Sequence, residues 1–326
     1  MRPAWTASEP FTTLTSVREL ANGSVLAVDF SEPAVYLITA AGQTSRQLGR
    51  KGSGPGEYLT PVRLIPLPND STLLLDRDAN RYLIIAPDGG IVVTTPFPEE
   101  MKVAGQFVQG ADRLGRLYFQ TRALPTTPTG PFTTAVLRWD RRTTRFDSVA
   151  AVRMPVASPL SGTLSDGSKY VGMRVLPFAP ADDWVVAPDG RVATVRATPY
   201  RLEWHGDARR RAVVGAPVSH DPVLVTERDR QRQEPQGPPY RLTYPKHKPA
   251  FVPGSVILDD QSRAWVRRQV PFGASMGEWD IFDGSAKYVK TVRLSTRKRI
   301  LAVTARFIYV ARTDDDDVQW LEAYSR

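Results

Sequence analysis

Apolar residues fall in short runs separated by turn-forming residues, and one arrangement of these runs recurs along the chain. The clearest runs are rich in β-branched and aromatic residues, and most follow Asn, Asp or Gly. This pattern is typical of β-strands bounded by tight turns. Each run is followed by two further strand-like runs with a Gly or Asp turn between them. The clearest runs are residues 25–29, 72–76, 116–119, 191–195, 263–266 and 306–310.

The spacing of these runs predicts the fold. They begin at residues 25, 72, 116, 191, 263 and 306, so three of the five steps are 43 to 47 residues long. That is the length of one four-stranded propeller blade. The two longer steps predict insertions at about 155–180 and 222–249, and the polar run 226–234 predicts a short exposed helix. We therefore expect a single all-β domain over residues 1–326, a six-bladed β-propeller with four-stranded antiparallel blades.

The two ends of the chain complement each other. The sixth unit stops after its third strand, at residues 318–324, whereas residues 3–11 precede the first unit and have no other assignment. An unpaired outer edge would promote aggregation. We expect the N-terminal strand to pair with the last blade and close the ring. Two β-sandwiches are the alternative for so many short strands, but the regular period and the complementary ends favour the propeller.

Charge and composition narrow the choice of partner. The chain has 43 Lys and Arg against 34 Asp and Glu, a formal charge of +9, which favours anionic partners. The cations are spread without a polybasic tail, so we do not expect nucleic acid. The chain contains no Cys, which excludes thiol catalysis, disulfides and Cys-ligated zinc. No apolar stretch is long enough to span a membrane. The first residues lack the apolar run of a signal peptide, so the protein stays inside the cell or these residues follow a trimmed start.

A linker and three shorter motifs carry a family resemblance. The linker Gly49-Arg50-Lys51-Gly52-Ser53-Gly54-Pro55-Gly56-Glu57-Tyr58 resembles that of bacterial six-bladed propellers related to NHL repeats. An uncharacterised branch from soil bacteria is similar at Ala187–Gly190 with Tyr200–Trp204, Arg263–Val266 and Asp316–Leu321. The resemblance implies the propeller fold and a periplasmic or extracellular location, often as a lipoprotein, with no assigned activity. The linker also superficially resembles a phosphate-binding loop, but no Lys-Ser or Lys-Thr ends it and no helix follows.

Cations near the start of the inner strands are the candidate site. Inner strands line the central channel of a propeller, and Arg18 and Arg63 both stand at even offsets before a turn Asn. Even offsets place two side chains on the same side of a strand. We expect a basic channel mouth that attracts an anionic ligand; the alternative is that these are solvated charges at strand ends. The fourth unit offers Asp182 and Asp183 instead. The candidate ligand-binding residues are Arg18, Arg63, Lys102, His247, Lys248 and Arg299.

Other residue types offer weaker signals for chemistry. His205, His220 and His247 could bind a metal only if at least two converge, which their spacing does not require. The run Asp314–Asp317 lacks the alternation of a calcium loop and predicts an exposed turn. No Ser stands in a Gly-x-Ser-x-Gly context. Asp29 and Asp76 end equivalent second strands, where their carboxylates could accept backbone N–H groups.

These observations favour a monomeric, non-enzymatic propeller without a cofactor. It would bind an anionic small molecule, glycan or protein at the channel mouth, or act as an interaction scaffold. The alternative is a metal-dependent hydrolase or lyase with a divalent ion at the propeller centre, as in other six-bladed propellers. The cations of the inner strands would repel such an ion.

Overall fold

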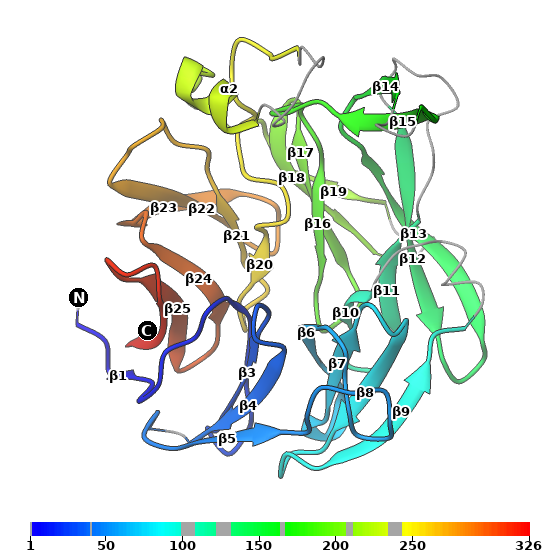
Figure 1. Ribbon diagram of the computed structural model, residues 1–326. Coiled ribbons are helices and arrows are strands. Elements are labelled where there is room, and N and C mark those ends of the chain that lie inside the picture. Colours follow the sequence, from blue (N-terminus) through cyan, green and yellow to red (C-terminus); the bar gives the residue numbers. More distant parts are fainter. Residues whose placement is uncertain are drawn as a thin grey trace.

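The computed structural model describes residues 2–39, 41–98, 108–121, 132–163, 167–206, 211–233 and 243–326. Six four-stranded antiparallel sheets surround a central channel, which confirms the six-bladed propeller (Figure 1). Blades 1 to 3 comprise β2 (Leu14–Glu19), β3 (Val25–Asp29), β4 (Ala34–Ile38) and β5 (Ser45–Leu48); β6 (Pro61–Pro66), β7 (Thr72–Asp76), β8 (Arg81–Ile85) and β9 (Ile91–Pro96); and β10 (Val108–Ala111), β11 (Leu117–Gln120), β12 (Thr133–Asp140) and β13 (Arg145–Arg153). None of the helices in these described ranges is long and apolar enough to cross a membrane.

The last three blades follow the same order of strands, from the channel outwards. They comprise β16 (Asp183–Val186), β17 (Val192–Ala197), β18 (Tyr200–His205) and β19 (Val213–Val214); β20 (Ile257–Leu258), β21 (Ala264–Arg267), β22 (Met276–Phe282) and β23 (Tyr288–Ser295); and β24 (Lys298–Val303), β25 (Phe307–Thr313) and β26 (Gln319–Ser325) with β1 (Trp5–Thr6).

The N-terminal strand closes the ring, as the sequence predicted. β1 pairs antiparallel with β26, with Trp5 opposite Ala323, and Phe11 forms a further bridge with Gln319. The two ends of the chain therefore lie close together at blade 6 (Figure 1). Trp5 packs edge-on against Tyr309 of β25, so the closing strand also buries an aromatic side chain in the last blade.

The second strands of blades 1 and 2 are largely apolar on both faces because both faces are covered. All five residues of β3, and all five of β7, are buried. In a propeller, the sheets pack face to face around the axis, so a strand inside one sheet contacts both neighbouring blades. Leu26 and Val28 of blade 1 thus pack with Leu64 and Leu74 of blade 2. This burial explains why the second strands are the clearest runs in the sequence.

The Asp residues that recur at the ends of the second strands are structural. Asp29 accepts hydrogen bonds from the backbone N–H groups of Thr12 and Thr13, and Asp76 accepts those of Leu59 and Thr60. These bonds confirm the predicted role of the two carboxylates, which fasten the entry of each blade to the end of its second strand. Hydrogen bonds to a carboxylate are stronger than bonds between neutral groups.

The side chain of Glu57 fills the centre of the Gly-rich linker between blades 1 and 2. The Glu57 carboxylate accepts the backbone N–H of Gly54 and an N–H of Arg50, whereas Arg81 donates to the carbonyls of Gly52 and Ser53. A Cβ on Gly52 would collide with the Glu57 carboxylate. Glu57 thus occupies the place that a bound anion would take in a phosphate loop, and the segment acts as a connection between blades.

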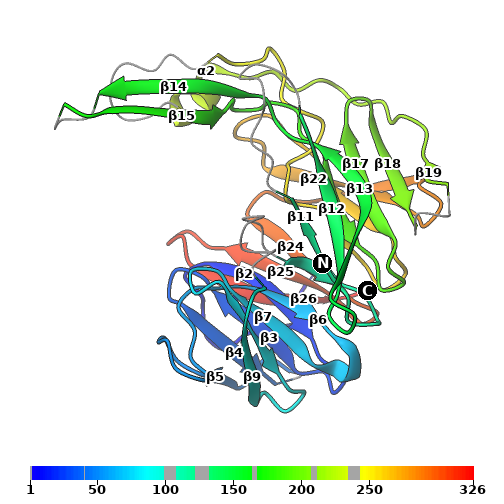
Figure 2. The ribbon, with the colours of Figure 1, turned by 90° about the vertical axis from the view of Figure 1, so that its right-hand side faces the viewer.

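Both insertions extend from the face on which the inner strands begin. The first forms a hairpin of β14 (Ala157–Thr163) and β15 (Lys169–Val175), which projects far from the ring (Figure 2). The second contains the predicted helix, α2 (Glu227–Gln233). A buried ion pair between Lys248 and Asp229, with 2.7 Å from Nζ to Oδ1, fixes α2 to the chain entering blade 5. The Lys248 ammonium also lies 5.5 Å from the Phe178 ring centre, after the hairpin.

Candidate functional site

A cavity of about 840 Å³ occupies the central channel. All six blades contribute to its wall, through residues of β2, β6, β10, β16, β24 and the segment 252–260 around β20. Ligand pockets in proteins usually measure about 300–1,000 Å³, so the channel has the size of a small-molecule site. Most of its wall is aliphatic, and its cations are Arg18, Arg63, Arg113, Arg267 and Arg299.

Three of the predicted site residues meet in this channel. Arg18, Arg63 and Arg299 line the cavity, and Lys102 lies outside the described residues. His247 and Lys248 do not line it. The inner strand of blade 5 begins at Ile257, about ten residues later than the sequence pattern suggested. His247 instead forms an isolated β-bridge with Leu224 beside α2, and Lys248 forms an ion pair with Asp229.

The pairing register shows which channel residues share one depth. In blades 1, 2, 4 and 6, a backbone hydrogen bond closes the hairpin between the inner and the second strand. Its donor is an N–H at the end of the inner strand, and its acceptors are the carbonyls of Ser24, Ser71, Arg191 and Phe307, respectively. Four residues further along each second strand stand Val28, Leu75, Val195 and Ala311. Their partners on the inner strands are Ser16, Arg63, Asp183 and Arg299, which therefore form one layer.

Blade 5 adds a residue to this layer that the sequence analysis missed. Its hairpin is closed at Arg263, and four residues later stands Arg267, the last residue of β21. The two-residue strand β20 pairs only with Trp265 and Ala264, so no residue of β20 covers Arg267. A second-strand side chain thereby reaches the channel. We call Arg63, Arg267 and Arg299 the arginine layer.

Arg18 lies deeper than the arginine layer and has a structural role. It pairs with Leu26, two residues closer to the hairpin than Val28, which places it about 7 Å from the level of Ser16. Arg18 and Arg63 therefore both reach the channel, but at different depths. The buried Arg18 guanidinium donates to Asp70 at 2.8 Å, to the Ser71 carbonyl at 2.6 Å and to the Thr72 hydroxyl. These contacts join blade 1 to blade 2.

The three arginines of the layer have few partners. Arg63 Nη1 donates to the Gln109 carbonyl at 3.1 Å, Arg299 Nη2 donates to the Leu14 carbonyl, and Arg267 makes no side-chain hydrogen bond to any described residue. Within the described part of the chain, none of the three forms an ion pair with a carboxylate. A guanidinium has five N–H donors. Most donors of the layer therefore have no acceptor among the described residues.

The surrounding channel wall disfavours the charge on each of these side chains, although Arg63 is exposed and Arg267 and Arg299 are half-buried. It lowers the pKa of Arg63, Arg267 and Arg299, and the neighbouring Arg267 lowers that of Arg299 further. The negative charge of Asp183 opposes the shift at Arg63. Arginine stays protonated in proteins because its ordinary pKa is so high. The layer therefore keeps three positive charges around one channel, and two of them, on Arg267 and Arg299, are only partly exposed to water.

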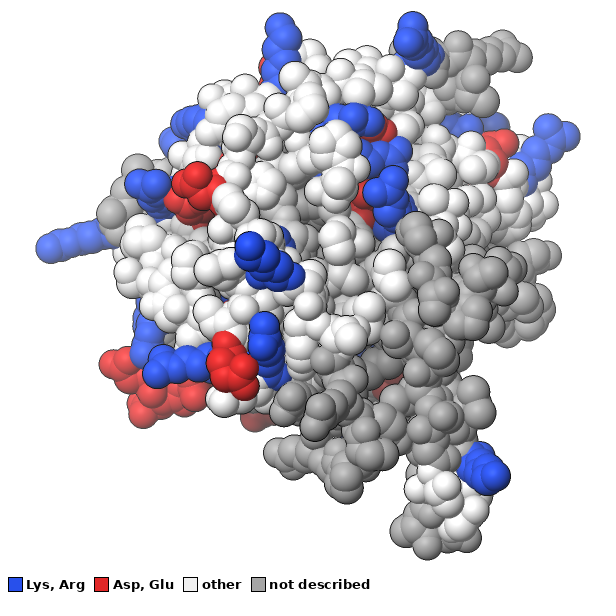
Figure 3. Space-filling view, turned by 90° about the horizontal axis from the view of Figure 1, so that it is seen from above, with Lys and Arg blue, Asp and Glu red and all other residues white. Residues whose placement is uncertain are grey.

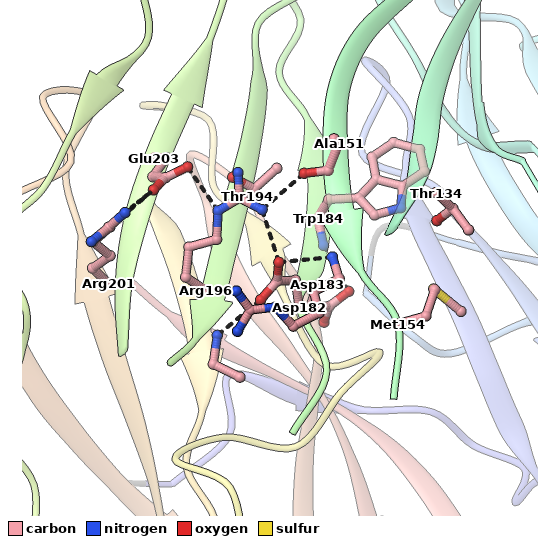
Figure 4. Close-up of polar contacts among 12 residues, drawn as sticks. Thr134, Ala151, Met154, Asp182, Asp183, Trp184, Thr194, Arg196, Arg201 and Glu203 are labelled. Atoms are coloured by element: carbon pink, nitrogen blue, oxygen red, sulfur yellow. Dashed lines mark hydrogen bonds and ion pairs between the residues drawn. The ribbon is translucent and has the colours of Figure 1, made fainter. Parts of the chain in front are cut away.

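Two neighbouring carboxylates on blade 4 have different roles. Asp182 forms an ion pair with Arg196 at 2.8 Å, and Arg196 forms a second ion pair with Glu203 at 2.7 Å (Figure 4). Asp183 is buried at the layer and accepts the backbone N–H groups of Trp184 and of residues 254–256 at the entry to blade 5. Burial raises the pKa of Asp183, although these four N–H groups favour its charged form. Asp183 thus holds blade 5 in place.

At the opposite end of the channel, charges are balanced. Four acidic side chains that line this end have arginine partners: Glu19 with Arg306, Asp112 with Arg116, Asp259 with Arg263 and Arg326, and Asp260 with Arg326. Arg113 has no ion pair among the described residues, but it is exposed to bulk water. On the outer surface seen from above, Lys and Arg lie singly or in small groups, with Asp and Glu beside some of them (Figure 3). Among the described residues of the channel wall, the half-buried arginines without a carboxylate partner are therefore Arg267 and Arg299.

Other candidate residues are used within the fold. His205 Nε2 lies 2.9 Å from the Thr194 hydroxyl, and His220 packs edge-on against Tyr200. Asp314 accepts two backbone N–H groups and the Trp320 Nε1–H, so its carboxylate shapes the turn that begins the acidic run. In the described ranges, no three His, Asp or Glu side chains cluster in a way that could hold a metal ion.

The fold is similar to that of other bacterial proteins. A member of the DUF4221 family from Bacteroides vulgatus has a TM-score of 0.55 and 9% identity, covering 99% of this chain and 94% of that one. A Bacteroides fragilis protein described as exported has a TM-score of 0.51 and 13% identity, covering 100% and 94%. At these identities, the likeness shows the β-propeller fold alone. No protein-family model matches the chain. No curated protein matches its sequence.

Proposed function

We propose that this propeller is a non-enzymatic binding protein that takes a small anionic ligand into its central channel, at the arginine layer. The observation that supports the proposal is the set of three arginines that face one cavity and pair with no described carboxylate. Arg267 and Arg299 are half-buried, and a cation withdrawn from water without a partner is costly; such costs persist mainly at functional sites. An anion in the channel would remove the cost.

A purely structural role explains these arginines only in part. Arg63 and Arg299 each bond to a carbonyl of the next blade, as Arg18 does. A neutral donor could make that single bond without placing a charge in the channel. Arg18 shows how a structural arginine in this protein is satisfied, with a carboxylate and two further acceptors. Arg267 has none of these contacts, and this contrast favours ligand binding.

The alternative function is a hydrolase or lyase with a divalent ion at the centre. Such an ion needs several oxygen or nitrogen ligands on the axis. Asp183 is a carboxylate at the level of the arginine layer, and its oxygens already accept four N–H groups. The arginines would repel a cation there. The binding function is therefore our first proposal, and the divalent ion is a result that the experiment below can reveal.

Two further proposals follow from resemblance. The linker Gly49–Tyr58 supports kinship with NHL-related propellers, and this kinship together with the similar fold of the Bacteroides fragilis protein supports a periplasmic or extracellular location. We also propose that the protein acts as a monomer, because the N-terminal strand already covers the open edge of blade 6.

The proposed function can be tested by calorimetric titration and thermal denaturation of the full chain. Anions and divalent cations would be compared at constant ionic strength, with a metal analysis of the purified protein. Saturable stabilisation by anions should be lost in Arg267→Gln and kept in Arg145→Gln. The control removes the same charge from an exposed position at the start of outer strand β13. Stabilisation by a divalent ion alone, or equal loss in both variants, would contradict the proposal.

A further inference from the structure

The proposed function leaves open what kind of anion fits the channel, and the chemistry of the wall narrows the choice. Resting on that function, we propose that the ligand is a small organic molecule with two negative charges and an apolar body. Its charged groups would contact the arginine layer. Its body would extend along the aliphatic part of the channel towards the opposite end.

The positions of the arginines indicate how many charges the site takes. Arg267 and Arg299 stand on adjacent blades and repel each other, so they converge on one part of the channel. Arg63 stands on blade 2, three blades from Arg267, and interacts with Asp183. Three arginines and one carboxylate give this described layer a formal charge of +2. Two negative charges on the ligand would balance it, as one phosphate monoester group or as two carboxylates.

The remaining wall favours an apolar body. Below the layer, the cavity is lined by Val185, Ile257, Leu301 and Ala302, and by Gly110, where a Cβ would collide with Val186. Burial of aliphatic groups against such a wall is favourable in proportion to the area removed from water. The cavity of about 840 Å³ is much larger than an inorganic anion requires. A bare phosphate or sulfate ion would leave most of the channel unfilled.

The layer also has the hydrogen-bonding capacity for such a group. An arginine can make two parallel bonds to a carboxylate or phosphate. Arg267 offers its whole guanidinium, and Arg299 uses one described contact, at the Leu14 carbonyl. The head group would therefore bind between blades 5 and 6. Arg63 is available for a second carboxylate across the channel, or for the remaining phosphate oxygen.

Four organic probes and inorganic phosphate separate these requirements by calorimetric titration of the full chain at pH 8. Hexyl phosphate carries two charges and a tail at this pH, because the second pKa of a phosphate monoester is about 6. Hexyl sulfate keeps the tail with one charge, and inorganic phosphate keeps the charge without a tail. Suberate and octanoate are the corresponding dicarboxylate and monocarboxylate. We expect hexyl phosphate or suberate to bind at least about tenfold more tightly than its singly charged counterpart and than inorganic phosphate.

Variants assign the effect to the layer. Arg267→Gln should reduce the preference for two charges over one to about threefold or less, whereas Arg145→Gln should leave it unchanged. Preference for hexyl phosphate over suberate would identify a single head group, and the reverse would identify two separated carboxylates.

Each failure has a distinct meaning. If neither hexyl phosphate nor suberate bound more tightly than its singly charged counterpart, or if neither bound more tightly than inorganic phosphate, the inference on the ligand would be overturned and anion binding left intact. Absence of binding by all five probes and by the wider anion panel would instead overturn the proposed function. A thermal melt of each variant verifies that it is folded.

Discussion

Removal of an arginine should make the unliganded protein more stable, if the arginine layer exists for a ligand. Arg267 is partly buried, contacts no described acceptor and is repelled by Arg299. Replacement of buried ionic groups by apolar residues of similar volume is stabilising by about 1–4 kcal/mol in favourable cases. Because Arg267 keeps contact with water in the channel, we expect the low end of this range for Arg267→Met, about 1 kcal/mol.

The corresponding change in melting temperature is small but measurable. With an unfolding entropy of about 2.1 cal/mol/K per residue, 326 residues convert 1 kcal/mol into a rise of about 1–2 °C. Differential scanning calorimetry in a buffer of weakly binding monovalent anions would detect it. The same variant should lose the stabilisation that a bound anion provides, which for the wild type is about 2.7 kcal/mol at a ligand concentration of 100 times Kd.

The next residue in the chain is a matched control. Arg268 donates to Asp280 at 3.1 Å and to the Ala250 carbonyl at 3.0 Å, and Asp280 is fully buried. Loss of one member of a buried ion pair costs about 3–5 kcal/mol, so Arg268→Met should be strongly destabilised. If Arg267→Met were destabilised to a similar extent, Arg267 would be a structural residue, and the argument from uncompensated charge would be refuted.

Three further predictions concern the frame around the channel. Arg18→Met should lower stability by about 3 kcal/mol in urea denaturation, because it leaves Asp70 and two acceptors without their donor; a change below about 1 kcal/mol would contradict the assigned role. Lys248→Met should speed hydrogen exchange in α2 without changing exchange in blade 2, and unchanged exchange in α2 would show that the ion pair does not hold the helix. Burial raises the pKa of Glu203, but hydrogen bonds from two arginines outweigh it and hold this pKa below its ordinary value. Its contribution to stability is therefore present above about pH 4.3 and lost as pH falls further. The Glu203→Gln variant should have a shallower loss of stability between pH 5 and 3, and a slope equal to that of the wild type would refute this.

Most of the fold could be predicted from the sequence because propeller blades place one strand under apolar cover on both sides. β3 and β7 are continuous apolar runs for this reason, and their spacing gave the blade count. The predicted closing segment 3–11 also pairs as expected, through β1 and Phe11. The helix in the second insertion was visible because its polar run contains no Gly or Pro.

The candidate site was harder to predict, since it depends on register and not on pattern. Even offsets placed Arg18 and Arg63 on one side of their strands, but they could not show that Arg63 is level with Ser16. Blade 5 was the larger difficulty. Its inner strand is two residues long and is preceded by an insertion, so no pattern marked its start. His247 and Lys248 were assigned to the channel as a result.

Arg267 was missed for the same reason. A second-strand residue is normally hidden behind the inner strand, but β20 ends before Arg267, and residues 250–252 pair there only through the Val252 N–H to the Arg267 carbonyl and a bridge from Phe251 to Arg268. One signal was present in the sequence. Arg267 and Arg268 follow the apolar residues of this strand directly, and none of the other predicted second strands contains two adjacent cations. A charged residue at a buried strand position is a reason to look for a partner or a ligand.

The pairing of Trp5 with Ala323 also determines when this protein can acquire its final shape during synthesis. Blade 6 cannot be completed until β26 has been made, and synthesis from β1 to β26 at about 5–20 residues per second takes roughly 15 to 65 seconds. During that time, the residues of β1 have no partner, and the strand that they will cover has not been made. The ring should therefore close as a late event, once the residues of β26 have emerged from the ribosome.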